Sequence, residues 1–170
     1  MKTCVAILLM SCLTALADFI PLAPIVEPLP EADVGALFHK IDNSEPIELS
    51  TLYRALRGPQ TTLRAYAAIE LGKYGDETSI PYLIDALSDE SIHEGAHYIK
   101  PGMNTTRYWA NESLKTLTKR DFGFVWDDPL DKRNEAILQW RNWYLGKKRP
   151  NNRFQGTPHK VRRPLNRDVR

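Results

Sequence analysis

Residues 61–89, TTLRAYAAIELGKYGDETSIPYLIDALSD, decide the fold of this chain. In the first half, apolar side chains recur on one face of a helix, at Leu63, Tyr66, Ala67, Leu71 and Tyr74. In the second half, the i, i+3, i+4, i+7 spacing of an amphipathic helix is met by Ile80, Leu83, Ile84 and Leu87. A Gly75-Asp76 turn separates the two halves. Because neither short helix can bury its apolar stripe alone, we expect further helices on both sides.

An internal repeat extends this helix pair in both directions. Residues 49–58 (LSTLYRALRG) align with residues 80–89 (IPYLIDALSD) at an offset of 31, which pairs Leu52 with Leu83. The helices that follow align at an offset of 43, through the pairs Arg64 and Arg107, Ala67 and Ala110, and Leu71 and Leu114. The difference of 12 residues marks an insertion between Asp89 and Arg107. Stacked helix pairs tolerate such loop insertions, so the repeat predicts a helical array.

Further helices are expected from residue 31 to residue 146. A helix over residues 31–41 would turn inward Val34, Leu37, Phe38 and Ile41. A helix capped by Asn104 or Thr105 would bury Ala110, Ser113, Leu114 and Leu117. A last helix, with Asp128 as N-cap and Pro129 as first helical residue, would bury Ala136, Ile137, Trp140, Trp143 and Tyr144. The fold class predicted is all-α, an α-solenoid of about three antiparallel helix pairs.

One family resemblance rests on the pattern R-x-x-A-x-x-x-L, a Gly-Asp turn and I-P-x-L-I-x-A-L-x-D. The pattern is carried by Arg64, Ala67, Leu71, Gly75, Asp76, Ile80, Pro81, Leu83, Ile84, Ala86, Leu87 and Asp89. It resembles the HEAT-like repeat, in the short form associated with phycobilisome-lyase-type proteins. The block over residues 105–144 is similar to the end of bacterial secreted HEAT-repeat proteins of unknown function. The resemblance implies an α-solenoid that binds partners along its surface. It also implies contacts between repeats from Arg64 and Arg107 to Asp76, Asp85 and Asp89.

The N-terminus has the pattern of a secretory signal peptide, residues 1–17. A basic start precedes an apolar run over residues 4–13, and the small-residue motif ALA at 15–17 predicts cleavage after Ala17. An apolar run of about ten residues is too short to span a bilayer, which needs about 20. The alternative is a lipoprotein anchored through Cys12, because LMSC resembles a bacterial lipobox. Residues 18–30 follow as a leader with four prolines, expected to be mobile or laid along the surface.

Both cysteines, Cys4 and Cys12, lie inside the predicted signal peptide. The cleaved protein would therefore contain no thiol, which excludes disulfides, thiolate metal sites and a cysteine nucleophile. Outside the cytoplasm, its stability must come from packing.

The charge of the chain is divided unevenly. Residues 147–170 carry nine Lys or Arg and one Asp, a net charge of +8, while the whole chain carries +2. The tail is thus strongly basic, and the remaining residues carry −6. We expect this tail to be disordered and solvated, although it could contact an anionic surface. Its only aromatic residue is Phe154, and we expect the chain to be exported, so we expect no nucleic-acid partner.

The motif HEGAH at residues 93–97 matches the zinc motif HExxH. On a helix, this spacing puts His93 and His97 one turn apart, with Glu94 as general base and Glu112 as a possible third ligand. However, the motif lies in the insertion and not in either aligned helix, and Pro101-Gly102 interrupts any helix that carries it. We therefore interpret it as a polar loop, with a zinc-dependent hydrolase as the alternative, and expect no metal and no cofactor.

The predicted function is that of a non-enzymatic interaction or scaffold module, exported to the periplasm or secreted. Its partner would be a protein that the sequence does not identify. The candidate binding surface combines the 90–103 insertion with Tyr98, Arg107, Tyr108 and Trp109. A structural envelope protein without a specific ligand is the other alternative.

Overall fold

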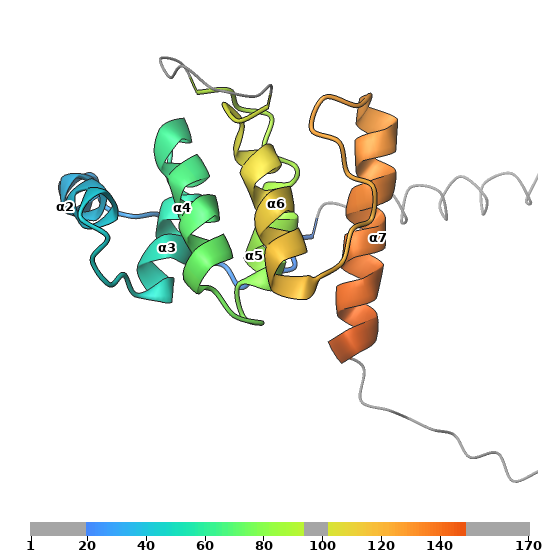
Figure 1. Ribbon diagram of the computed structural model, residues 1–170, viewed down its shortest axis with the longest axis horizontal. Coiled ribbons are helices and arrows are strands. Elements are labelled where there is room, and N and C mark those ends of the chain that lie inside the picture. The colour runs from blue at the N-terminus through green and yellow to red at the C-terminus, as the bar shows by residue number, and fades with distance from the viewer. Residues whose placement is uncertain (1–19, 94–101, 149–170) are drawn as a thin grey trace, which may run out of the picture.

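The computed structural model describes residues 20–93 and 102–148. These residues form six helices, in the order α2 (Glu31–Asp42), α3 (Leu49–Leu56), α4 (Thr61–Tyr74), α5 (Ile80–Ala86), α6 (Thr106–Thr118) and α7 (Leu130–Lys148). Within the described ranges the only β pairing is an isolated antiparallel bridge between Ile92 and Thr105. The all-α prediction is confirmed. Figure 1 shows the helices following one another across the molecule from α2 to α7.

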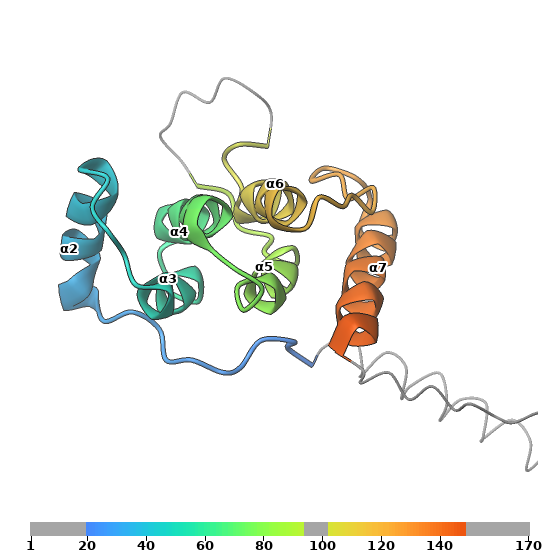
Figure 2. The same ribbon diagram turned by 60° about the horizontal axis from the view of Figure 1, so that its bottom comes forward.

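Two helix pairs form the centre of the molecule. In each pair the second helix packs on the first, α4 on α3 and α6 on α5. The pairs then meet helix to helix, because α4 lies against α6 and α3 lies beside α5. Figure 2 shows this arrangement end-on, with α4 and α6 in one layer and α3 and α5 in the other. The contact between α4 and α6 is the most extensive between any two helices described.

The repeat predicted from the sequence places matching residues in the core. Leu52 of α3 and Leu83 of α5 are both fully buried, and so are Leu71 of α4 and Leu114 of α6. Burial of an aliphatic side chain stabilises the fold by roughly 1.5 to 3 kcal/mol. The aligned leucines therefore supply equivalent parts of one continuous core.

The helices pair differently from the prediction, because residues 61–74 and 80–89 are expected to form one pair, whereas α4 packs on α3 and α5 packs on α6. Helix α6, which follows the insertion, is thus the second member of the pair begun by α5. The last helix, α7, has its most extensive helix contact with α5. At the other end, α2 reaches the core through Leu37 and through an edge-on contact between Phe38 and Tyr66. The described chain thus has two pairs flanked by single helices.

The buried face of α4 also differs from the prediction. Leu63, Ala67 and Leu71 are buried as expected, but Tyr66 and Tyr74 are exposed, at 39% and 61%. The buried side of α4 instead includes Ala65, Ala68 and Glu70. The reason is that α4 packs against α3 on one side and α6 on the other. A helix with two neighbours buries a wide face, and alanines allow the neighbouring backbones to approach.

The ends of the last two helices follow their capping residues. Thr105 caps α6, since its side-chain oxygen accepts a hydrogen bond from the backbone N–H of Tyr108 at 3.3 Å. Helix α7 begins at Leu130, one residue later than predicted, and the carbonyl of Pro129 accepts the first bond from the N–H of Arg133 at 3.1 Å. Helix α7 also continues to Lys148, past residue 146, where the helical region was expected to end.

Several predictions fall outside the described residues. These are the signal peptide, the lipobox cysteine Cys12, Tyr98, the motif residues Glu94 and His97, and the basic tail beyond Lys148. Among the helices that are described, none combines the length and the apolar character needed to cross a membrane.

Candidate functional site

Three acids at the end of α5 organise the arginines of the other helices. Asp85 lies 3.2 Å from Arg57 and 3.6 Å from Arg141. The next two acids are paired as well, Asp89 with Arg64 at 2.7 Å, and Glu90 with Arg107 at 2.8 Å and Arg133 at 2.5 Å. These arginines come from α4, α6 and α7 and from the end of α3. The network therefore ties four helices to the end of the short α5.

Of the contacts that the resemblance implied between arginines and acids, those of Arg107 and Asp76 differ in the structure. The Arg64–Asp89 pair is present as the resemblance implied, but Arg107 pairs with Glu90 and reaches only the backbone carbonyl of Asp89, at 3.3 Å. Asp76 has no arginine partner among the described residues. Its carboxylate instead accepts two hydrogen bonds from Thr78, from the backbone N–H at 2.7 Å and from the hydroxyl at 2.6 Å. Asp76 thus shapes the α4–α5 turn.

The acids of this network should make the fold sensitive to low pH. Burial by itself raises the pKa of Asp89, but hydrogen bonds from Arg64 and Ser91 outweigh it and leave the pKa below its ordinary value. The hydrogen bond from Arg133 is the main reason that the pKa of Glu90 is lowered too. A carboxyl whose pKa is lower in the folded protein than in the unfolded chain stabilises the fold at any pH above its unfolded-chain pKa, which is about 4. This stabilisation is lost as the pH falls toward and through the pKa of the folded protein. We expect the melting temperature to drop steeply below pH about 4.

A matched pair of variants tests this origin of the acid sensitivity. In Asp89→Asn, part of the drop between pH about 5 and 3 should disappear, because the variant has no carboxyl to protonate. In Asp42→Asn, which changes an exposed acid that has no ion pair with any described residue, the pH profile should match the wild type. Calorimetric melting from pH 7 to 2 measures all three proteins. Equal profiles for Asp89→Asn and the wild type would show that the acid sensitivity arises elsewhere.

The zinc motif begins at the closed base of the insertion. The backbone N–H of His93 donates to the carbonyl of Asn104 at 3.0 Å, next to the Ile92–Thr105 bridge. The His93 side chain is 4% exposed, and burial lowers the pKa of its imidazole. Glu112, the possible third ligand, belongs to α6 and has its carboxylate 3.3 Å from the ammonium of Lys115. Within the described residues no three His, Cys, Asp or Glu side chains gather as metal ligands would.

We expect the purified protein to contain no stoichiometric zinc. His93 is packed at the base of a loop and Glu112 is committed to Lys115, so two of the predicted ligands already serve the fold. Elemental analysis of protein purified without chelators, beside His93→Ala, checks the expectation. One zinc per chain in the wild type and none in the variant would contradict it and would favour the hydrolase alternative.

The predicted binding surface around the insertion is largely part of the fold. Arg107 is 7% exposed, and its Nε donates to the carbonyl of Trp126 at 2.7 Å. The indole N–H of Trp109 donates to the carbonyl of Met103 at 2.8 Å, and its ring meets Tyr108 edge-on at 5.2 Å. Both Tyr108 and Trp109 are half-buried. Arg107 is therefore a structural residue, and the two aromatic side chains hold the start of α6 against the end of the insertion.

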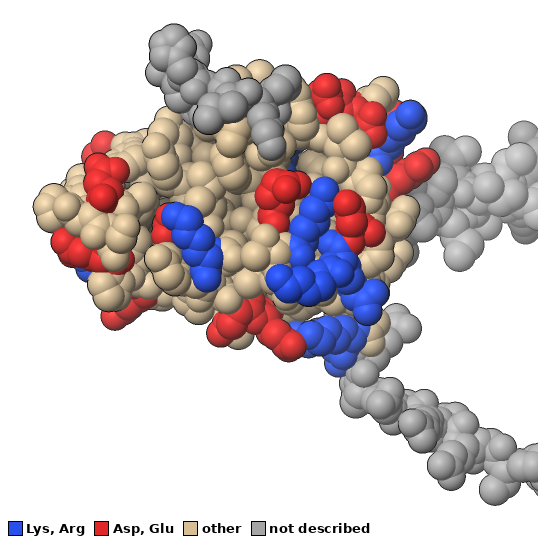
Figure 3. Space-filling model, in the orientation of Figure 1, with Lys and Arg blue, Asp and Glu red and all other residues tan. Residues whose placement is uncertain are grey.

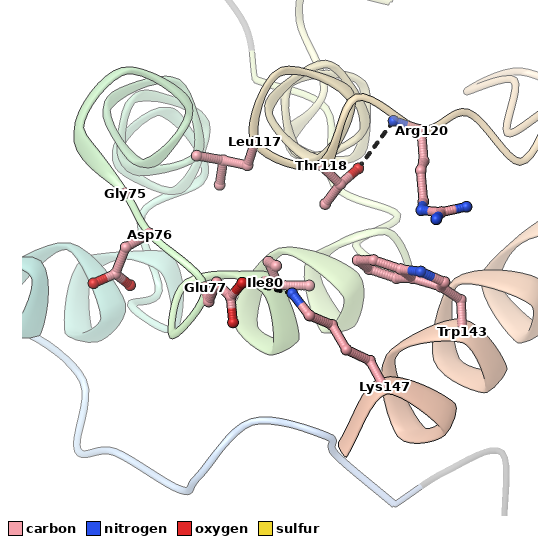
Figure 4. A pocket seen from close by; sticks show the side chains of 9 residues that line it. All are labelled: Gly75, Asp76, Glu77, Ile80, Leu117, Thr118, Arg120, Trp143 and Lys147. Carbon is pink, nitrogen blue, oxygen red and sulfur yellow. Dashed lines mark hydrogen bonds and ion pairs between the residues drawn. The ribbon is translucent and has the colours of Figure 1, made fainter. Parts of the chain in front are cut away.

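A cleft of about 630 Å³ lies between the α4–α5 turn, the end of α6 and the last turns of α7. Its lining is Gly75, Asp76, Glu77, Ile80, Leu117, Thr118, Arg120, Trp143 and Lys147. Figure 4 shows Trp143 and Lys147 projecting into this space from α7, while Asp76 points away from it. We call it the Trp143 cleft.

The end of α6 directs Arg120 into the Trp143 cleft. Lys119 adopts the left-handed conformation (φ 56°), and its N–H donates to the carbonyl of Lys115, which ends the helix. The next N–H, that of Arg120, donates to the hydroxyl of Thr118 at 3.2 Å. This tight reversal places the guanidinium carbon of Arg120 at 5.5 Å from the centre of the Trp143 ring.

The charges in the Trp143 cleft are unevenly paired. Lys147 lies 5.9 Å from the centre of the Trp143 ring, and its ammonium contacts Glu77 at 2.6 Å. The hydrogen bond from Lys147 lowers the pKa of the Glu77 carboxyl. Arg120, by contrast, has no hydrogen bond or ion pair from its guanidinium to any described residue, unlike the six other described arginines. Figure 3 shows basic side chains gathered over the end of α6 and the adjacent part of α7.

Sequence reasoning did not find this cleft. It placed Trp143 in the core, put Lys147 in the tail and left Arg120 without a role. The i, i+4 spacing of Trp143 and Lys147 on one helix face was a usable signal. The sequence carries no such signal for Arg120 and Glu77, because their positions near Trp143 depend on how α6 and the α4–α5 turn are placed.

Comparisons of this chain with protein-family models, with curated proteins and with solved structures find no match, so the resemblance to HEAT-like repeats stays a prediction.

Proposed function

We propose that this protein is a non-enzymatic interaction module that binds a partner protein through the Trp143 cleft. The observation that carries the proposal is the guanidinium of Arg120. It is held over an aromatic ring at the cleft, without a polar partner among the described residues. Other arginines of the fold are used internally, as in the pairs of Arg57, Arg64 and Arg133. Among the arginines in the described ranges, Arg120 is thus the one that the fold leaves available for a ligand.

The chemistry of the cleft selects the kind of ligand. A guanidinium binds a carboxylate with two parallel hydrogen bonds. Because the ammonium of Lys147 is already paired with Glu77, Arg120 supplies the positive charge that a carboxylate would meet. The half-buried ring of Trp143 offers apolar contact area next to that charge. Arginine and tryptophan are also the side chains most often responsible for binding energy at protein interfaces. The ligand we propose is therefore an acidic segment of the partner protein.

The architecture suits such a module. Two helix pairs pack side by side, and we propose that they are a minimal α-solenoid. The cleft is built at one end of these helices, from the α4–α5 turn, α6 and α7. A rigid support keeps Arg120 and Trp143 in place before a partner arrives, which lowers the entropy lost on binding.

Export to the cell envelope is part of the proposal. It is supported by the signal-peptide pattern of residues 1–17 and by the absence of cysteine after Cys12. N-terminal sequencing of the protein secreted by its native cell should start at Asp18. A lipid-modified N-terminus at Cys12 would instead indicate the anchored alternative, and an intact Met1 would contradict export by cleavage.

Binding can be tested with two defined peptides. An N-acetylated peptide of alternating Glu and Gly and its Gln-Gly counterpart are titrated into isotope-labelled full-length protein. We expect the Glu peptide to shift the NMR signals of the Trp143 indole and the Arg120 backbone, and the Gln peptide to leave both unchanged. Removing the guanidinium in Arg120→Gln should weaken binding of the Glu peptide about tenfold, since a charged hydrogen bond contributes about 1.5 to 3 kcal/mol.

The matched control for this test is Lys132→Gln. It removes one positive charge from an exposed position of α7 that does not line the cleft. This variant should bind the Glu peptide as the wild type does. Equal binding by Arg120→Gln and the wild type, or equal shifts from the Glu and Gln peptides, would overturn the proposed site.

A further inference from the structure

The leader of this protein lies on the helices in the way that a bound peptide would. Figure 2 shows residues 20–30 running along α3 and α5, from the side of α7 to the start of α2. At its first residues, the N–H groups of Leu22 and Ala23 donate to the two carboxylate oxygens of Asp85, at 2.9 and 3.0 Å. Arg141 of α7 donates to the carbonyl of Ile20 at 2.5 Å. Asp85 and Arg141 thus bind main-chain atoms of the leader.

A second anchor holds the other end of the leader. The N–H of Leu29 donates to the carbonyl of Arg54 at 3.3 Å, and Nε of Arg54 donates to the carbonyl of Glu27 at 3.3 Å. Two side chains enter the helix surface, Ala23 at 5% exposed and Leu29 at 6%. Between them Ile25 points outward and is 87% exposed. Recognition therefore depends on main-chain groups, on two buried side chains six positions apart, and on Leu22 and Val26, which are half-buried against the core.

We propose that this surface, the leader groove formed by Arg54, Asp85 and Arg141, is a binding site for extended proline-rich peptides. The leader is its intramolecular ligand. Prolines keep a peptide extended without internal hydrogen bonds and lower the entropy lost when it binds. They also carry no N–H, so residues such as Leu22, Ala23 and Leu29 present the few donors that the groove must satisfy. The ligand class is a peptide with two successive N–H groups, a small second residue and a leucine six positions later.

The leader groove extends beyond Ile20, which is the first described residue of the leader. A cavity of about 680 Å³ lies beside Ile20, and its α7 side combines the apolar Leu130, Ile137 and Leu138 with polar and charged residues such as Asp131 and Glu135. Leu130 and Leu138 are 59% and 44% exposed. A longer peptide could bury these side chains in addition to the contacts of the leader. Because the leader is part of the same chain, its effective concentration is high, and an external peptide should bind well only after the leader is released.

Release of the leader in the full-length protein tests the proposal. The variant Ala23→Glu places a charged side chain where Ala23 is buried, so the leader should leave the groove. A fluorescein-labelled peptide with the sequence of residues 20–30, IPLAPIVEPLP, is titrated and its anisotropy recorded. We expect binding to Ala23→Glu at least tenfold tighter than to the wild type. The added change Asp85→Asn should remove most of that gain. Ile25→Glu, which alters an exposed leader residue, should behave as the wild type.

Two outcomes would overturn the proposal. One is a folded Ala23→Glu protein that binds the peptide no better than the wild type. The other is equal binding of a peptide with the same residues in scrambled order. Circular dichroism verifies folding, and Leu29→Glu provides a second release variant at the other anchor if Ala23→Glu does not fold. The Trp143 cleft takes no part in these measurements, so the two proposals fail or succeed separately.

Discussion

Replacing Trp140 with alanine should lower the free energy of unfolding by about 3 to 5 kcal/mol, the largest loss expected from a single side chain here. The side chain of Trp140 is fully buried. Its ring meets Phe122 edge-on at 4.6 Å and Trp143 at 5.8 Å. Truncation would leave a cavity where α7 packs on the segment that precedes it. Urea unfolding, followed by far-UV circular dichroism, measures the loss.

The control for this prediction is Trp140→Phe. The indole N–H of Trp140 is buried and has no hydrogen-bond partner in the described part of the chain. Phenylalanine keeps most of the apolar contact and removes this unsatisfied donor, so the loss should stay below about 1.5 kcal/mol. An unfolding free energy for Trp140→Ala within about 1 kcal/mol of the wild type would contradict the buried position of the ring.

Replacing Gly72 with leucine should destabilise the protein by about 3 kcal/mol, because it forces α4 and α6 apart. A Cβ atom at position 72 would lie 2.4 Å from the hydroxyl oxygen of Ser113 and 3.2 Å from its Cα. That hydroxyl donates to the carbonyl of Ala68 at 2.7 Å, so it is also held in place. Thermal unfolding of the variant should show a melting temperature many degrees lower, with the transition still cooperative.

Two further variants separate this clash from the intrinsic preference of glycine. Gly35 lies in α2, and a Cβ added there meets nothing within 4 Å. Gly35→Ala should therefore raise the unfolding free energy by about 0.5 to 1 kcal/mol through helix propensity. The single variant Gly72→Ala should lose stability, because the added Cβ meets Ser113. In the double variant Gly72→Ala with Ser113→Gly, the glycine is on α6 instead of α4, and most of that lost stability should be recovered. A Gly72→Leu protein as stable as the wild type would show that α4 and α6 do not approach closely at this point.

Much of the fold could be predicted because its signals are local. The periodicity of Ile80, Leu83 and Leu87 predicts the inward face of α5, and all three are buried. The alignment at offsets of 31 and 43 predicts which residues repeat in the core. Capping by Thr105 follows from the preference of threonine for that position. Each of these inferences needs only residues within a few turns of one another or a repeated pattern.

The candidate sites could not be predicted in the same way. Arg107 looked available to a partner, but the carbonyl of Trp126 and the carboxylate of Glu90 occupy it. Nothing near Arg120 in the sequence indicates Trp143, which lies 23 residues later. The contact of Asp85 with the N–H of Leu22 joins residues 63 positions apart. Such pairs have no periodic signature, because they result from how whole helices are placed.

Local patterns in the chain thus indicate its helical class, the approximate positions of its helices and many of the residues that form its core. Hydrophobic periodicity and capping act over a few residues, so they can be read along the sequence. Tertiary packing decides which faces of α4 are buried, which arginines of the protein form ion pairs within the fold, and where the leader lies. These depend on how close two helices approach, as at Gly72 and Ser113, and that distance is set by all the side chains between them.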